Sequence, residues 1–152
     1  MYIVRKQLSD FSAAHRLING YEGKCAHLHG HNYIPTVEIG SKKLDEMGIV
    51  IDFNIIKKLF NEWLVQHWDH STLVAAHDLP LLEFLTKNQQ KHYIFPEGNN
   101  TTAEVMAEFL FQKFSFLLKS QYGHLSLLSV TLAETCQSAV TFRPINIFSE
   151  EY

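Results

Sequence analysis

Alternation of apolar and polar positions predicts β-strands towards both ends of the chain. An apolar residue at every second position lets one face of a strand pack against a core. Four segments are predicted to be strands, with a tight turn between the last two: 2–9, 29–39, 125–135 and 138–148. Pro35 interrupts the hydrogen-bond donors of the second segment, which predicts a sheet edge or a bulge there.

Apolar residues at three- and four-residue spacing predict two amphipathic helices. Asp52 precedes the first helix and suits an N-cap. The second helix begins at Thr101 or Thr102, and Thr101 and Glu104 have the spacing of a capping box. The predicted helices cover these ranges: 53–67 and 101–119.

The remaining segments are short or irregular. Residues 48–52 and 92–95 are predicted to be short β segments, whereas 71–100 as a whole shows no regular period. Without the short segments, the order is strand, strand, helix, helix, strand, strand, which favours the α+β class with an antiparallel sheet. No repeat or flexible linker marks a boundary, so 1–152 is expected to form a single domain.

Composition excludes several classes of protein. Hydrophobic residues make up 46% of the chain and charged residues 19%, as in ordinary globular proteins. The net charge of −3 argues against a nucleic-acid partner. No apolar run approaches the roughly 18 residues of a membrane span, and the N-terminus lacks the features of a signal peptide. We therefore expect a cytoplasmic protein without a membrane partner, in which Cys25 and Cys136 are reduced thiols.

Histidines are concentrated near the N-terminal end, where four of the nine lie in a short window. His29 and His31 are two positions apart, so on a strand both imidazoles point to the same side and can reach one metal ion. His15 would supply a third nitrogen if the first two strands are antiparallel neighbours. His27 has the same parity, and it is excluded only if the strand begins after Leu28.

Cys25 decides what such a metal site could do. Three neutral histidines leave one coordination position of a zinc ion open, as in catalytic sites. If the thiolate of Cys25 filled that position, the site would be closed and the chain would be a non-catalytic zinc-binding module. Glu134 favours a ligand-binding site, because a carboxylate that continues an apolar strand face is costly without a partner.

Six motifs together resemble the 6-pyruvoyltetrahydropterin synthase superfamily, and the match runs from about Ile3 to Phe142. They occur in this order: FSAAHRL (11–17), C-x-x-x-HGHNY (25–33), IVIDF (49–53), WDH (68–70), TTAEVMA (101–107) and AETC (133–136). Cys25 lies four residues before the first histidine of HGH, which is similar to the bacterial 6-carboxy-5,6,7,8-tetrahydropterin synthase branch. The branch that serves folate synthesis has a glutamate in place of this cysteine.

The resemblance implies a role for each candidate site residue. His15, His29 and His31 would be the ligands of Zn²⁺, and His27 would be a bystander or a substrate contact. The remaining roles follow from the same motifs: Cys25 as the catalytic acid or base, Asp69 and His70 as its proton-transfer partners, Glu134 as the anchor of the pterin edge, and Thr102 as a weaker substrate contact.

The resemblance also implies a fold and a reaction. The fold is the tunnelling fold (T-fold), a four-stranded antiparallel sheet with two helices that assembles into a trimeric barrel and a hexamer, with active sites between subunits. The substrate is a small pterin, 7,8-dihydroneopterin triphosphate. The products of the favoured branch are 6-carboxytetrahydropterin, acetaldehyde and triphosphate, on the route to queuosine. The alternative within the family is a 6-pyruvoyltetrahydropterin synthase, which keeps the three-carbon side chain.

Overall fold

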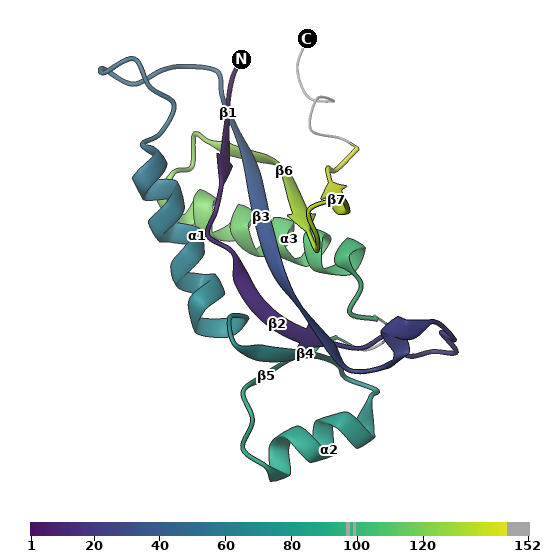
Figure 1. Ribbon diagram of the computed structural model, residues 1–152. Helices are drawn as coiled ribbons and strands as arrows, with labels where there is room; N and C mark the ends of the chain where they lie inside the picture. Colours follow the sequence, from purple (N-terminus) through teal and green to yellow (C-terminus); the bar gives the residue numbers. More distant parts are fainter. Residues whose placement is uncertain (97, 99, 146–152) are drawn as a thin grey trace.

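The computed structural model describes residues 1–96, 98 and 100–145. Within these residues the chain forms seven strands, three α-helices and a short 3-10 helix, η1 (Figure 1). In chain order they are β1 (Tyr2–Gln7), β2 (Phe11–His15), η1 (Lys24–Ala26), β3 (His29–Ser41), α1 (Phe53–His67), β4 (Ser71–Ala75), α2 (Leu79–Lys87), β5 (His92–Phe95), α3 (Ala103–Gln121), β6 (Ser126–Ala133) and β7 (Ala139–Phe142). The predicted α+β class is confirmed.

The long strand β3 organises the sheet. Its first half pairs antiparallel with β2 and its second half with β1, while β6 pairs along its other edge. Tyr33, Val37 and Ile39 lie on one face of β3 and are fully buried, as the two-residue period predicts. β6 and β7 form the predicted hairpin. The end of the last predicted strand, 146–148, lies outside the described residues.

Pro35 lies inside β3 and not at an outer edge of the sheet, but the predicted irregularity is present beside it. Gln7 pairs with Thr36 and Phe11 with Tyr33, so residues 8–10 lie opposite only residues 34–35, as in a bulge. Pro35 faces Leu132 of β6 on one side. On the other side it falls in the gap between the end of β1 and the start of β2, where the amide of Leu8 donates to the Pro35 carbonyl (2.8 Å). No backbone N–H is needed at this position of β3. The strand therefore tolerates proline, which lacks one. On the β6 side, β3 has a separate register shift between Glu38 and Ile39.

The sheet is larger than the four antiparallel strands that the resemblance implied, and the described part has three helices where two were expected. The strand order is β5-β4-β2-β3-β6-β7, with β1 also paired to β3. β4 pairs in parallel with both β2 and β5, so the sheet is mixed. Figure 1 shows α2 at one end of the molecule, next to β4 and β5.

The segment 71–100 contains two elements that the sequence did not predict. β4 does not show the alternation of apolar and polar residues that marks a half-buried strand. α2 buries only Leu81 and Leu85, and two apolar positions are too few to reveal a helical period. The strand predicted over 92–95 is confirmed as β5. By contrast, residues 48–52 form a loop and not the predicted strand. Their apolar side chains Val50 and Ile51 are buried all the same, which explains the strand-like pattern of the sequence.

α1 and α3 pack on each other through the stacked rings of Phe60 and Phe114, whose centroids are 4.3 Å apart. Asp52 caps α1, as predicted, by accepting from the amide of Asn54 (2.7 Å). Thr102, and not Thr101, caps α3, so Glu104 is one position too early for the predicted capping box. In the described part of the chain, no helix combines the length and apolarity needed to cross a bilayer.

An ion pair joins the end of β2 to the start of α2. Arg16 follows the last residue of β2, and its guanidinium donates from Nε to Oδ2 of Asp78 (2.7 Å) and from Nη2 to Oδ1 (2.5 Å). Only 4% of the Asp78 side chain is exposed, so its charge depends on this bidentate partner. The hydrogen bonds from Arg16 lower the pKa of the Asp78 carboxyl below its ordinary value of 3.8.

We predict that Asp78→Asn lowers the free energy of unfolding at pH 7 by about 2 kcal/mol, as urea denaturation would measure. A carboxyl group whose pKa is lowered by folding stabilises the protein above that pKa, and this contribution disappears as the pH falls through it. The difference between the variant and the wild type should therefore shrink below pH 3.8. The control is Arg143→Met, which breaks an exposed ion pair with Glu38 and should cost less than about 1 kcal/mol. Equal losses in the two variants would contradict the prediction.

Candidate active site

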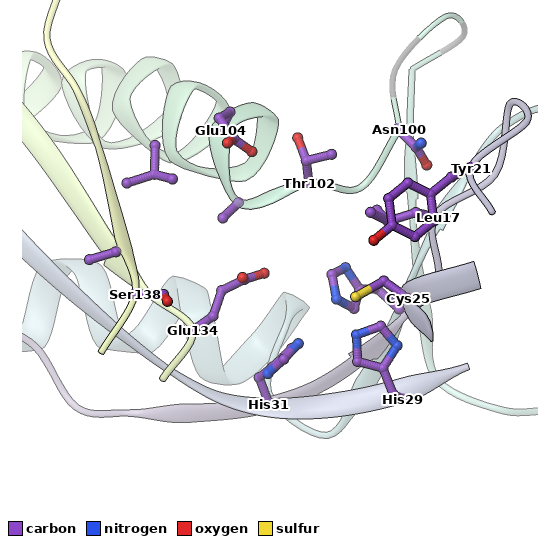
Figure 2. Close-up of a pocket in the computed structure, with 14 residues that line it drawn as sticks. Leu17, Tyr21, Cys25, His29, His31, Asn100, Thr102, Glu104, Glu134 and Ser138 are labelled. Carbon is purple, nitrogen blue, oxygen red and sulfur yellow. The ribbon is translucent and has the colours of Figure 1, made fainter. Parts of the chain in front are cut away.

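A cavity of about 500 Å³ opens where β2 and β3 meet the loop 16–28 and the start of α3. Figure 2 shows side chains from all these elements converging on it. Six of the residues that the sequence singled out line this cavity: His15, Cys25, His29, His31, Thr102 and Glu134.

The three histidines meet because of the strand register. His15 ends β2 directly opposite His29 of β3, and His31 lies two residues further along the same face. The ring centroids of His15 and His29 are 4.6 Å apart, and those of His29 and His31 are 4.9 Å apart. One nitrogen from each ring lies within 4.8 Å of the others, which is close enough for one ion to reach all three.

Two of the rings are oriented by backbone carbonyl groups. Nδ1 of His15 lies 2.6 Å from the carbonyl oxygen of Thr101, and Nδ1 of His29 lies 2.7 Å from that of His27. Each Nδ1–H therefore donates, which leaves Nε2 as the nitrogen with a free lone pair. The Nε2 atoms of His15 and His29 are buried and have no hydrogen-bond partner. Buried nitrogens in this state call for another partner, and a metal ion supplies one.

The protonation state of His15 also suits a metal ligand. Burial lowers its pKa to about 4, although the hydrogen bond to Thr101 acts in the opposite direction. The imidazole is therefore neutral at pH 7, as a ligand must be. Three neutral nitrogens are the donor set of catalytic zinc sites. Among the described residues, Cys25 does not belong to the group of converging donors, so this geometry favours the open site over the closed one.

Cys25 lies in η1, at the rim of the same cavity. Its carbonyl accepts from the amide of Leu17 (2.7 Å), which holds the loop closed near the histidines. In Figure 2 its sulfur points into the cavity, next to the hydroxyl of Tyr21. Cys25 and Cys136 are both free thiols, as predicted. β3 begins at His29, so His27 lies before the strand and contributes its carbonyl rather than a ligand.

Glu134 and Thr102 enter the cavity from the two elements that face the histidines. β6 ends at Ala133, so Glu134 begins the turn to β7, and it is half-buried and not part of the apolar strand face that was expected. Figure 2 shows its carboxylate pointing towards the histidines. Thr102 lies at the N-terminus of α3, where its hydroxyl caps the helix by accepting from Val105 (3.3 Å).

Glu104 and Tyr21 are among the cavity-lining residues that sequence analysis did not assign to the site. Glu104 was interpreted only as part of a capping box, yet its carboxylate lies at the cavity (Figure 2). Tyr21 lies over Gly23, where a Cβ atom would come within 2.4 Å of the tyrosine hydroxyl. The signal that could have found Glu104 is its place in the motif TTAEVMA, two residues after Thr102.

Asp69 and His70 do not reach this cavity within one chain. They form the turn between α1 and β4, and Nδ1 of His70 lies 2.9 Å from Oδ2 of Asp69. His70 lines a different cavity, of about 270 Å³, together with Ala14 and Gly30. Ala14 and Gly30 alternate with the histidines along β2 and β3, so their side of the sheet is the opposite one. A triad of these two residues with Cys25 is not assembled in the single chain.

Hydrogen bonds fix the Asp69 carboxylate. Its Oδ1 accepts from the amide of Ser12 (3.0 Å). Burial alone would raise the pKa of Asp69, but the hydrogen bonds from Ser12 and His70 and the charges of His70 and Lys91 outweigh it, and the pKa lies below its ordinary value. Asp69 is therefore ionised at neutral pH and can orient the imidazole of His70.

Comparisons with known proteins agree with the geometry. A family model described as 6-pyruvoyl tetrahydropterin synthase matches residues 3–144. A 6-carboxy-5,6,7,8-tetrahydropterin synthase of Rickettsia bellii is 38% identical over 100 residues, covering 64% of this chain and 70% of the relative. One of the same name from Synechocystis is 32% identical over 149 residues, covering 93% of each chain. The solved structure of Caenorhabditis elegans 6-pyruvoyl tetrahydropterin synthase is 26% identical, with a TM-score of 0.64, and covers 95% of this chain and 97% of its own.

We predict that His29→Ala abolishes metal binding, because two nitrogens do not hold zinc against a chelator as three do. Elemental analysis of the wild type should give about one zinc ion per chain. A chelator should lower its melting temperature, since a ligand that binds only the folded state stabilises it. His27→Ala is the matched control and should keep its zinc. Loss of zinc from both variants, or from neither, would contradict the assignment.

Proposed function

The chain belongs to the 6-pyruvoyl tetrahydropterin synthase family, and on this premise we propose that it is a zinc-dependent 6-carboxy-5,6,7,8-tetrahydropterin synthase. Membership confirms the predicted family and the prediction of an enzyme. The proposed reaction converts 7,8-dihydroneopterin triphosphate, with uptake of water, to 6-carboxytetrahydropterin, acetaldehyde and triphosphate, and it would serve queuosine biosynthesis. We propose that residues 1–152 act as one domain in this reaction.

The observation that carries the proposal is the shared cavity. Three histidines with two buried, unpartnered Nε2 atoms lie in the same cavity as a free thiol and a half-buried carboxylate. A closed structural zinc site would need none of the carboxylates around it. Relatives that bear the name 6-carboxy-5,6,7,8-tetrahydropterin synthase support the choice of product over the pyruvoyl alternative.

Each residue has a task that its position permits. A zinc ion held by His15, His29 and His31 would act as a Lewis acid on the hydroxyl groups of the substrate side chain. The carboxylate of Glu134 can accept hydrogen bonds from the guanidine-like edge of the pterin, opposite the histidines. In this arrangement the pterin ring would lie between Glu134 and the histidines, with its side chain next to the sulfur of Cys25.

Cys25 would move protons on the substrate side chain. A thiolate is the reactive form, and a neighbouring cation favours it. Removal of a proton from a carbon next to a C=O or C=N bond gives an enol, and successive enolisations lead to loss of triphosphate. The water that the reaction takes up would add to the side-chain carbonyl group before the carbon–carbon bond breaks. Returning each proton to another carbon requires a second acid–base group.

We infer that this second group comes from another copy of the chain. Asp69 and His70 form an ion pair at a surface turn, and 81% of the His70 side chain is exposed. Because they lie on the opposite side of the sheet from Cys25 in one chain, they can serve a cavity only across a subunit interface. The proposal therefore includes a homo-oligomer, a trimer or a hexamer, with active sites between subunits.

Product analysis tests the reaction. Incubation with 7,8-dihydroneopterin triphosphate should release acetaldehyde and a carboxypterin, and a chelator should stop both. Cys25→Ala should lower turnover by at least about 100-fold, the usual contribution of a general acid or base. Cys136→Ala, at an exposed thiol outside the cavity, should leave turnover unchanged. A pyruvoyl pterin without acetaldehyde would assign the alternative activity, and undiminished turnover by Cys25→Ala would refute the role of the thiol.

Mixing two inactive variants tests the intersubunit site. Cys25→Ala and His70→Ala should each be inactive alone. After the two are unfolded and refolded together, about a quarter of the sites in random oligomers should combine an intact Cys25 with an intact His70 from another subunit. Activity should recover to that extent. If the mixture stays inactive while each variant keeps the oligomeric state of the wild type, the two residues do not act across an interface.

A further inference from the structure

The turn that carries Asp69 and His70 is held in an unfavourable conformation. The φ angle of His70 is +56°, in the left-handed region that residues other than glycine rarely adopt. The amide of His70 donates to the carbonyl of Ser12 (2.7 Å), and the amide of Asp69 donates to that of Leu64 (2.8 Å). A strained residue persists only where its surroundings over-determine it, and such residues concentrate at functional sites.

Lys91 also stabilises this turn through hydrogen bonds. Its ammonium group donates to the carbonyl of Asp69 (2.7 Å) and to the carbonyl of Val65 in the last turn of α1 (3.0 Å). The backbone of Lys91 is also fixed, because its carbonyl accepts from the amide of Thr72 (3.0 Å), two residues after His70. Lys91, the residue before β5, is therefore bonded to α1, to the turn and to β4.

The segment between β4 and β5 places the lysine there. α2 ends at Lys87, Gln89 turns the chain with a φ of +53°, and the amide of Gln90 donates to the carbonyl of Leu85 (2.9 Å). The chain then enters β5 in parallel with β4. Lys91 and His70 consequently line the same cavity.

We propose that Lys91 is a positioning residue for the Asp69–His70 pair, acting by tying the Asp69 carbonyl to the end of α1. The proposal rests on the proposed function, in which that pair transfers protons. A lysine that served only as the C-cap of α1 would need only the carbonyl of Val65. The shorter bond goes to Asp69, the residue that orients the His70 imidazole. The charge of Lys91 also helps to keep the pKa of Asp69 low.

Three substitutions separate positioning from general stabilisation. Lys91→Met keeps the aliphatic stem and removes the donors, Lys91→Arg restores a cationic donor, and Lys87→Met removes an exposed lysine of the same segment. Lys91→Met should lower kcat by about 10- to 100-fold, because small displacements of a reacting group have effects of this size. KM should change by less than about twofold, since binding does not use the turn. Lys91→Arg should recover most of kcat, and Lys87→Met should match the wild type.

Amide hydrogen exchange gives a readout that does not depend on turnover. In Lys91→Met the amide of His70 should exchange at least about tenfold faster, while the amides of β6 keep their protection. If the methionine variant does not fold, Lys91→Gln takes its place in both measurements. An unchanged kcat, equal losses in Lys91→Met and Lys87→Met, or a failure of Lys91→Arg to recover activity would overturn the proposal. If the wild type does not turn over the pterin, the proposed function fails, and unchanged exchange at His70 would overturn the positioning role separately.

Discussion

The antiparallel pairing of β2 with β3 is the constraint on which the site depends. It sets His15 directly opposite His29 and leaves His31 on the same face. A slip of one residue would turn every side chain of β2 to the other face and remove His15 from the cavity. The donor set is therefore a property of the strand register, and the carbonyl groups that orient the rings complete a geometry that the sheet has already imposed.

The segment just before α3 links this register to the rest of the cavity. The side-chain amide of Asn100 exchanges two hydrogen bonds with the backbone of Ile18, of 3.0 and 3.1 Å, and so holds the loop that carries Cys25. Thr101 orients His15 through its carbonyl, and Thr102 caps the helix and lines the cavity. Three consecutive residues thus fix the loop, one of the three converging histidines and the helix terminus, and they hold the thiol, the imidazoles and the facing wall of the cavity in a constant arrangement.

The sequence predicted what depends on local pattern. The parity of HGH, the N-cap at Asp52 and the hairpin near the C-terminus are short-range signals, and the structure has all three. It did not predict β2 as a separate strand, the parallel pairing of β4, or α2, because these depend on contacts between distant segments. Glu104 was not assigned to the site, because the spacing of a capping box explained it equally well. The distance of the Asp69–His70 turn from Cys25 has no signal in one sequence, since a motif gives order along the chain and not which subunit a residue serves.

The contact between His15 and Thr101 also links the proposed metal site to the start of α3. It joins positions 86 residues apart, whereas HGH lies within a single strand. Contacts that close such long loops form late, because their entropic cost comes before any gain from packing. If the site binds a metal ion, as proposed, the third imidazole takes its final orientation only when the start of α3 is in place. The affinity for the metal would then depend on whether α3 has docked.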